Sequence, residues 1–287
     1  MFNKRHIVRT IAATASILAL SFTAACGFGQ STASNSTDSD DITQQTYKPG
    51  KLTIATGQPA YEPWVMNDKP ESGEGYEAAV AYAVADKLGF KKSDVVWTRT
   101  AFDTAIAPGA KDWDFNIQQF GITDERKKAV DFSSSYYNDS QSVVVKKDSK
   151  FANATKVSDL KDATVGVMVG TLAYDYAKAN IKDDIQTFND DAALAQALDA
   201  GQIDALVTST VECVYMVQSE QVKDAKVLGR LPDSEDKSGM GIVLPKDSKL
   251  TAAVTKAVDD LNADGTIKKL QDKWLAEYTT DLTELKK

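Results

Sequence analysis

The sequence predicts an α/β protein of two lobes, each built on a mostly parallel sheet flanked by helices. Short apolar segments of strand character alternate along the chain with segments whose apolar residues recur at helical spacing. Such alternation is typical of α/β units with mostly parallel sheets. The part of the chain after residue 50 is longer than one typical hydrophobic core, so we expect two lobes.

The individual elements follow from local periodicity. Residues 52–56 have the pattern of a strand, and Tyr76, Val80 and Val84 share one face of a helix that Gly89 ends. Further strands are expected at residues 95–97, 115–117, 143–145, 164–169, 185–188 and 203–207. Two more helices are expected at residues 171–180 and 190–200.

The first 26 residues have the pattern of a secretory leader. Three basic residues precede an apolar run over 11–20, which is too short to span a membrane as a helix. The small residues before Cys26 resemble a lipobox, although Thr23 stands where that motif usually carries Leu. We therefore expect a lipoprotein signal peptide over residues 1–25 and a lipidated Cys26. The alternative is an ordinary secreted protein cut near Ala25.

Residues 26–50 are rich in Ser, Thr, Asp and Gln. They carry too little apolar surface to fold on their own, so we expect a disordered tether. A tether behind a lipidated cysteine suits a protein that stays near a membrane partner.

The mature chain is acidic. The whole chain has 33 basic and 41 acidic residues and a net charge of −8. Loss of residues 1–25 removes three basic and no acidic residues, which lowers the net charge to −11. Nucleic-acid binding favours basic patches, so we expect no nucleic-acid partner.

Histidine and cysteine usage limits the chemistry of the mature chain. The only histidine, His6, lies in the leader, which leaves no histidine base and no histidine metal ligand. Cys26 and Cys213 are the only cysteines, so lipidation of Cys26 prevents an intrachain disulfide, and Cys213 is expected to be buried. We expect no enzyme activity, no cofactor and no metal site.

Arg126 is the strongest candidate for a ligand contact. It lies just past the expected strand at 115–117, with Gln118, Gln119 and Thr123 nearby. An arginine stays charged and pairs through two N–H groups with a carboxylate, so this arrangement favours a small acid as the ligand. The alternative is a surface arginine paired with a neighbouring acidic residue, an interaction that is common and weak.

Several motifs favour the ligand contact. Residues 122–126, together with Val-Asp-Phe-Ser at 130–133 and Tyr-Tyr at 136–137, resemble a segment of the bacterial extracellular binding proteins that feed amino acids to ABC importers. In that family the segment holds the α-carboxylate of the ligand. Weaker matches keep the family's order over residues 51–278, and they include Ala-Tyr-Glu-Pro-Trp at 60–64 and Val-Gly-Val-Met-Val-Gly-Thr at 165–171.

The resemblance implies a type II periplasmic-binding-protein fold. Lobe 1 would comprise residues 51–140 and 239–287, and lobe 2 would comprise residues 141–238. Two hinge crossings, near 137–142 and 234–239, would join the lobes, and the C-terminal helices would pack back on the first lobe.

The resemblance also implies the residues of the binding site. Tyr61 and Trp64 would cover the ligand, and Arg126 would hold its carboxylate from the same lobe. Thr171, at the start of a helix in the second lobe, would add a hydroxyl and a backbone N–H, so that the ligand favours the closed state. The other expected ligand-binding residues are Glu62, Gln119, Gly121, Thr123, Gly170 and Ser209.

Three positions depart from the family's pattern. Ser209 stands where the family places the aspartate that meets the ligand's ammonium group, Gln58 replaces an acid of some basic-amino-acid binders, and Gly121 replaces Ser or Thr. A buried ammonium without a carboxylate is costly. Either another acid takes the role, or the ligand lacks an α-ammonium group. The candidate acids are Glu62, Glu77 and Glu212.

The resemblance predicts a monomeric, lipid-anchored substrate-binding protein on the extracellular face of the cell membrane. It would deliver a polar amino acid or a related small carboxylate to the permease of an ABC transporter. One alternative is a secreted dehydratase-like enzyme of the same fold that acts on a small organic acid. Another is the extracellular sensor part of a receptor or channel, which would carry a transmembrane helix or a signalling domain.

Overall fold

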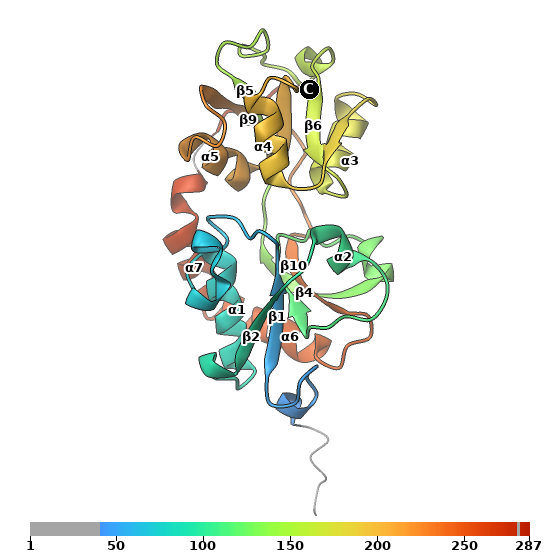
Figure 1. The fold of residues 1–287 in the computed structure, drawn as a ribbon, viewed down its shortest axis with the longest axis vertical. Helices are drawn as coiled ribbons and strands as arrows, with labels where there is room; N and C mark the ends of the chain where they lie inside the picture. The colour runs from blue at the N-terminus through green and yellow to red at the C-terminus, as the bar shows by residue number, and fades with distance from the viewer. Residues whose placement is uncertain (1–40, 280–281) are drawn as a thin grey trace, which may run out of the picture. The chain divides into compact units, whose positions relative to one another are not determined.

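The computed structural model describes residues 41–279 and 282–287, which contain two five-stranded sheets (Figure 1). The strands of the first sheet are β1 (Leu52–Thr56), β2 (Val95–Arg99), β3 (Phe115–Asn116), β4 (Val130–Tyr137) and β10 (Met240–Pro245). Those of the second sheet are β5 (Gln141–Lys146), β6 (Val165–Met168), β7 (Gln186–Phe188), β8 (Ala205–Ser209) and β9 (Ala225–Arg230). Each sheet with its helices forms one lobe, so the expected two-lobed α/β fold is confirmed.

The two sheets have the same arrangement of strands. Their strand orders are β2-β1-β3-β10-β4 and β7-β6-β8-β5-β9. The first three strands of each order pair in parallel, and the last two are added in antiparallel pairings. The four strands added in this way, β4, β5, β9 and β10, are those that flank the two segments between the sheets, residues 138–140 and 231–239. Each sheet is therefore mixed, rather than mostly parallel as expected.

The helices also match the expected alternation. They are α1 (Tyr76–Lys87), α2 (Phe102–Ile106), α3 (Leu172–Asn180), α4 (Asp191–Asp199), α5 (Thr210–Gln218), α6 (Thr251–Ala263) and α7 (Thr266–Trp274). Thr171 and Asp190 are the N-caps of α3 and α4, and each side chain accepts a hydrogen bond from a backbone N–H of the first turn. None of the helices in the described part of the chain is long and apolar enough to cross a membrane.

Apolar side chains cover both faces of each sheet. On the first sheet, Ile54 faces the cluster formed with α1, α6 and α7, whereas its neighbour Ala55 faces a second cluster that contains Trp113. On the second sheet, Leu206 and Val207 likewise belong to different clusters. Because successive strand residues point to opposite faces, a strand that is covered on both faces reads as a nearly continuous apolar run.

The residues before β1 correct the expected tether. Residues 41–50 were assigned to a disordered segment, but they fold against the first lobe. A 3₁₀ turn, η1 (Ile42–Gln44), packs Ile42 against the core, and the backbone N–H of Tyr47 donates to Asp114 Oδ1 at 2.5 Å. The buried Asp114 carboxylate needs hydrogen-bond donors such as the backbone N–H of Tyr47. This requirement explains why the polar residues 41–50 are ordered. Residues 26–40 of the expected tether, and Cys26 with them, lie outside the described residues.

The C-terminus crosses between the lobes a third time. Leu275, just after α7, is buried in the core of the first lobe, but Leu285 is buried in the core of the second. There the backbone N–H of Leu285 donates to Arg230 O at 2.8 Å, and the N–H of Arg230 donates to Thr283 O at 2.9 Å. The expected range 239–287 for the first lobe is therefore too long, because the last residues add to the edge of β9 (Figure 1).

Candidate ligand-binding site

A cavity of about 250 Å³ is lined by residues of both lobes. The first lobe contributes the loop after β1, the residues after β3, Phe102 and Arg126. The second lobe contributes the ends of β6 and β8 and the starts of α3, α4 and α5. The ends of parallel strands and the starts of helices meet in this cavity, which is where open α/β sheets bind ligands.

Arg126 lies in the wall of the cavity and links the two lobes. Its Nη1 donates to Gly121 O at 2.7 Å, and its Nη2 donates to Gly170 O of the second lobe at 2.8 Å. The guanidinium lies over the ring of Phe102 at 5.4 Å, and burial lowers the pKa of Arg126 from its ordinary value. Two backbone carbonyls and a ring thus orient a cation whose other N–H donors remain for a ligand.

Thr123 and Gly170 act through Arg126 and do not line the cavity. Thr123 Oγ1 accepts a hydrogen bond from the backbone N–H of Arg126 at 3.1 Å, which starts the 3₁₀ turn η5 (Arg126–Lys128). Gly170 accepts from the guanidinium through its carbonyl oxygen. Both were expected to touch the ligand, but in the structure each positions the arginine.

Gly121 lines the cavity, and the structure explains why this chain has no Ser or Thr there. A Cβ at residue 121 would lie 2.6 Å from Leu172 Cδ1 and 2.9 Å from Asp236 Oδ2. Such distances are shorter than van der Waals contact, so a side chain would push against α3 of the second lobe. Glycine therefore allows the close approach of the two lobes beside Arg126.

Tyr61 and Trp64 form an aromatic wall and reach across to the second lobe. Trp64 is 1% exposed, and its Nε1 donates to Glu212 Oε2 at 3.1 Å. The hydroxyl of Tyr61 accepts a hydrogen bond from the backbone N–H of Ala192, at the start of α4, at 3.3 Å. Burial raises the pKa of the Tyr61 hydroxyl, which keeps it neutral. Both rings line the cavity, as expected.

Thr171 and Ser209 also line the cavity, but their hydroxyls serve the helices that they cap. Thr171 Oγ1 donates to Met168 O at 2.8 Å and accepts from the N–H of Tyr174 at 3.2 Å. Ser209 Oγ accepts from the N–H of Glu212 at 3.3 Å. The Thr171 hydroxyl has thus used its only donor, and the Ser209 hydroxyl also hydrogen-bonds the carboxylate of Asp139.

The three candidate glutamates lie in different places. Glu62 is outside the cavity and accepts from the N–H of Asn67 at 2.9 Å. Glu77 is fully buried behind the cavity and accepts from Gln119 and Tyr136. Glu212 alone of the three lines the cavity. Its Oε1 is buried and has no hydrogen-bond partner.

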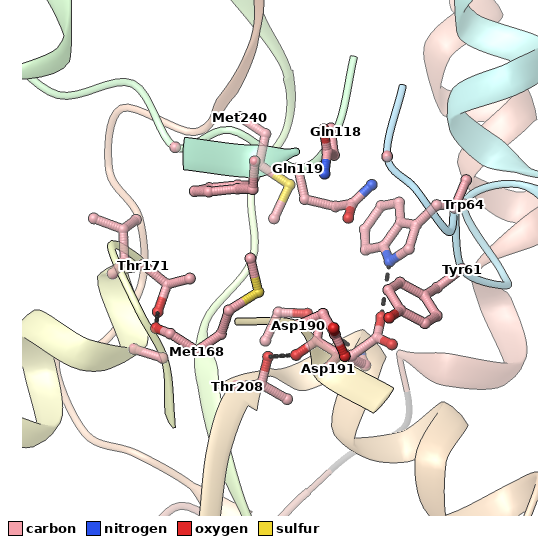
Figure 2. Close-up of a pocket in the computed structure, with 18 of the residues that line it drawn as sticks. Tyr61, Trp64, Gln118, Gln119, Met168, Thr171, Asp190, Asp191, Thr208 and Met240 are labelled. Carbon is pink, nitrogen blue, oxygen red and sulfur yellow. Dashed lines mark hydrogen bonds between the residues drawn. The ribbon is translucent and has the colours of Figure 1, made fainter. Parts of the chain in front are cut away.

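Four further acidic residues line the cavity and were missed by sequence reasoning. They are Asp139, Asp190, Asp191 and Asp236. Figure 2 shows Asp190 and Asp191 beside Tyr61, on the opposite side of the cavity from Gln118 and Met240. Two of these residues, Asp190 and Asp191, could have been found from the sequence as a pair of aspartates just after a strand. Such a pair, however, also has the pattern of a helix N-cap.

Burial raises the pKa of three acids that line the cavity, Asp139, Asp191 and Glu212. It raises the pKa of Asp139 to about 6, and burial with the charge of Asp190 raises the pKa of Asp191 to about 6. Burial and the neighbouring Asp191 also raise the pKa of Glu212 well above its ordinary value. Crowded carboxylates in a low-dielectric site repel one another, so the site favours a positive charge beside them.

The charge balance of the cavity is strongly one-sided. Five carboxylates and a single cationic side chain, Arg126, occur among the described lining residues. This set matches a small molecule that carries a carboxylate and at least one positive charge. Within the described residues, no three His, Cys, Asp or Glu side chains are arranged to hold a metal ion.

Two α/β lobes that share a small cavity define the class of solute-binding proteins with the type II periplasmic-binding-protein fold. The model of the bacterial extracellular solute-binding proteins, family 3, matches residues 52–277, and the chain belongs to this family.

Known relatives are similar over most of the chain. The L-arginine-binding protein of Pseudomonas aeruginosa is 29% identical over 80% of this chain and 88% of its own length. The L-cystine-binding protein TcyJ of Escherichia coli (strain K12) is 30% identical over 77% of this chain and 81% of its own. Among solved structures, an ancestral arginine-binding protein bound to arginine is 31% identical with a TM-score of 0.67, and the match covers 78% of this chain and 98% of that one.

Proposed function

We propose that the protein binds an amino acid in the cavity between its lobes and delivers it to the permease of an ABC transporter. Arg126 would hold the α-carboxylate, and Glu212 would hold the α-ammonium group. One observation carries this assignment: a buried carboxylate with an unpartnered oxygen, Glu212 Oε1, lines the same cavity as a partly engaged guanidinium.

Glu212 is suited to replace the aspartate that the family places at Ser209. The two residues belong to the same helix start, since Ser209 caps α5 and Glu212 lies in its first turn. The longer side chain of glutamate compensates for a position one turn further along the helix. A ligand ammonium would supply the missing partner of Oε1 and relieve the repulsion from Asp191.

The remaining acids favour a ligand with an additional positive charge. Asp190 and Asp191 are left without a cationic partner if Glu212 and Arg126 take the α-groups. The relatives named as L-arginine-binding and L-cystine-binding support an amino acid with more than one charged group. Gln58, which also lines the cavity, supplies a neutral amide where some binders of basic amino acids carry an acid.

Hydrogen bonds between the lobes support a hinge-bending mechanism. Tyr61, Trp64 and Arg126 of the first lobe each bond a group of the second lobe around the cavity. A ligand that touches both walls adds contacts only in the closed state, and so it shifts the equilibrium toward closure. Closure would then present both lobes to the permease together.

We propose binding without catalysis, at the extracellular face of the membrane. The single histidine of the chain lies in the leader, and the buried acids are paired or suited to hold a cation. Membership of an extracellular family supports the location. The lipid anchor at Cys26, and the monomeric state, rest on the sequence pattern and the family resemblance.

The test is a thermal-shift and calorimetry panel on the mature chain after removal of copurified ligand by unfolding and refolding. L-arginine, L-lysine, L-cystine, L-glutamine and L-glutamate are compared with the 2-oxo acid derived from arginine. We expect the largest stabilisation from cationic amino acids, little from glutamate, and much weaker binding of the 2-oxo acid. If no amino acid raises the melting temperature, or if the 2-oxo acid binds as tightly as arginine, the proposal is wrong.

A further inference from the structure

Glu77 is a buried carboxylate that the proposed ligand contacts do not use. It is fully buried in the first turn of α1, behind the cavity wall, and it is not a lining residue. Its Oε1 accepts hydrogen bonds from the backbone N–H of Gln119 at 2.7 Å and from the hydroxyl of Tyr136, and its Oε2 accepts from Gln119 Nε2. One side chain therefore holds both the backbone and the side-chain amide of Gln119.

These bonds determine which end of the Gln119 amide faces the cavity. An ionised carboxylate only accepts hydrogen bonds, so the NH₂ group of Gln119 must turn toward Glu77. The amide oxygen is then left on the other side. Figure 2 shows Gln119 with its oxygen turned toward the cavity and its nitrogen turned away. Gln119 also has a φ of 48°, a left-handed conformation that the bond from its N–H to Glu77 helps to hold.

We propose that Glu77 is a positioning residue that sets the polarity of the cavity wall at Gln119. By binding the NH₂ group, it presents an acceptor oxygen to the ligand, which selects ligands that carry N–H donors. The inference rests on the proposed function only in taking an amino acid as the ligand. It adds a residue outside the cavity to the determinants of specificity.

Hydrogen bonds among the neighbouring tyrosines hold the Glu77 carboxylate in place. Tyr76 donates from its hydroxyl to the carbonyl of Tyr136 at 2.6 Å, and Tyr136 donates to Glu77, so the carboxylate is held from its far side as well. Burial raises the pKa of Glu77 to about 7. At pH 8 the group is mostly ionised and acts only as an acceptor, which makes this the condition for the test.

Substitution of glutamine for Glu77 keeps the shape and changes the hydrogen bonding. The new NH₂ group would face the NH₂ group of Gln119, and two donors do not bond each other. The Gln119 amide relieves the conflict by turning over, which places its NH₂ group in the cavity. The exchanged pair, E77Q with Q119E, restores a donor–acceptor match with the roles exchanged: the amide at 77 donates to the carboxylate at 119, whose other oxygen remains an acceptor for the cavity.

The first measurement reads the amide directly, in the ligand-free protein at pH 8. The side-chain NH₂ of Gln119 should exchange its protons with water at least tenfold more slowly than that of the exposed Gln44, and this protection should disappear in E77Q. Fast exchange in the wild-type protein would overturn the proposal, whatever the ligand proves to be.

The second measurement is calorimetry with L-arginine at pH 8. We expect E77Q to bind about tenfold more weakly, because the wall then offers a donor in place of an acceptor, and the exchanged pair to return to within about threefold of the wild type. E62Q is the matched control, since Glu62 also accepts a backbone N–H but lies outside the cavity. Equal losses in E77Q and the exchanged pair, with unchanged melting temperatures, would contradict the inference. Absence of L-arginine binding by the wild type would count against the proposed function, and the exchange measurement would still decide the inference.

Discussion

Trp64 and Glu212 meet across the two lobes, where the indole N–H donates to Glu212 Oε2 at 3.1 Å and leaves Oε1 without a partner. This single bond joins the aromatic wall of one lobe to the acid of the other. The glutamate is therefore held in place for a cation only when the lobes are closed. In the proposed function, closure and the recognition of positive charge would therefore depend on the same side chain.

Replacement of Glu212 by glutamine tests its role as the ammonium partner. We expect E212Q to weaken the binding of L-arginine by about 2–4 kcal/mol, because a buried cation loses its counter-charge. The 2-oxo acid derived from arginine should lose much less. Calorimetry on both ligands measures the difference, with E62Q as the control. An equal effect on both ligands would remove Glu212 from the ammonium site.

Replacement of Arg126 by lysine tests the carboxylate contact. Lysine keeps the charge but has only three N–H donors on one nitrogen, so it cannot keep the bonds to Gly121 O and Gly170 O and also pair with a carboxylate through two N–H groups. We expect the affinity for amino acids to fall by about 1.5–3 kcal/mol, with a nearly unchanged melting temperature of the ligand-free protein. Equal binding by the two proteins in calorimetry would show that Arg126 is not the anchor.

The stability of the ligand-free protein should fall as the pH rises from 5 to 7.5. Burial raises the pKa of Asp139 and Asp191 to about 6 and that of Glu77 to about 7, so the folded protein keeps protons that the unfolded chain has released. Their stabilising contribution is complete below the ordinary carboxyl pKa near 4 and is lost as the pH passes through 6 and 7. Exposed acids with a lowered pKa, such as Asp264, change the free energy of unfolding only at lower pH.

Urea unfolding at pH 5 and pH 7.5 measures this effect. We expect the free energy of unfolding to drop by about 2–4 kcal/mol between the two values, and less in D191N, which lacks one of the titrating groups. Saturating L-arginine should reduce the drop, because a bound cation favours the ionised acids. A free energy of unfolding that rises over this interval would contradict the pKa directions.

Replacement of Cys26 by serine tests the lipid anchor. Serine has no thiol that could carry a diacylglyceryl group through a thioether. We therefore expect C26S to appear in the medium, whereas the wild-type protein stays in the membrane fraction until detergent is added. A wild-type protein that needs no detergent for release would exclude the anchor.

The sequence pointed to residues of the cavity where a residue type has few structural roles at its position. Arg126, Tyr61 and Trp64, which were singled out because a charged fork and large rings beside strand ends have few structural roles there, line the cavity. Thr123 does not line the cavity, and its hydroxyl accepts from the backbone N–H of Arg126, a turn-capping role that the sequence does not distinguish from ligand contact.

Other parts of the site depend on contacts that no local pattern reveals. Asp191 appears as an ordinary first-turn acid of α4, and only the approach of the first lobe makes it a wall of the cavity. Glu77 was considered a candidate for ligand contact, although its partner is Gln119, 42 positions along the chain. Such pairings follow from the tertiary fold, not from spacing.

The third crossing of the chain has a consequence for the way in which the protein matures. Domains generally fold as units, from the N-terminus first, as a chain emerges. Here the second lobe is interrupted: its core includes Leu285, which is separated from the rest of that lobe by β10, α6 and α7 of the first. The second lobe can complete its core only after the whole polypeptide has emerged. The core of the first lobe ends with Leu275 and Tyr278, so we expect the second lobe, which needs Leu285, to complete its core last.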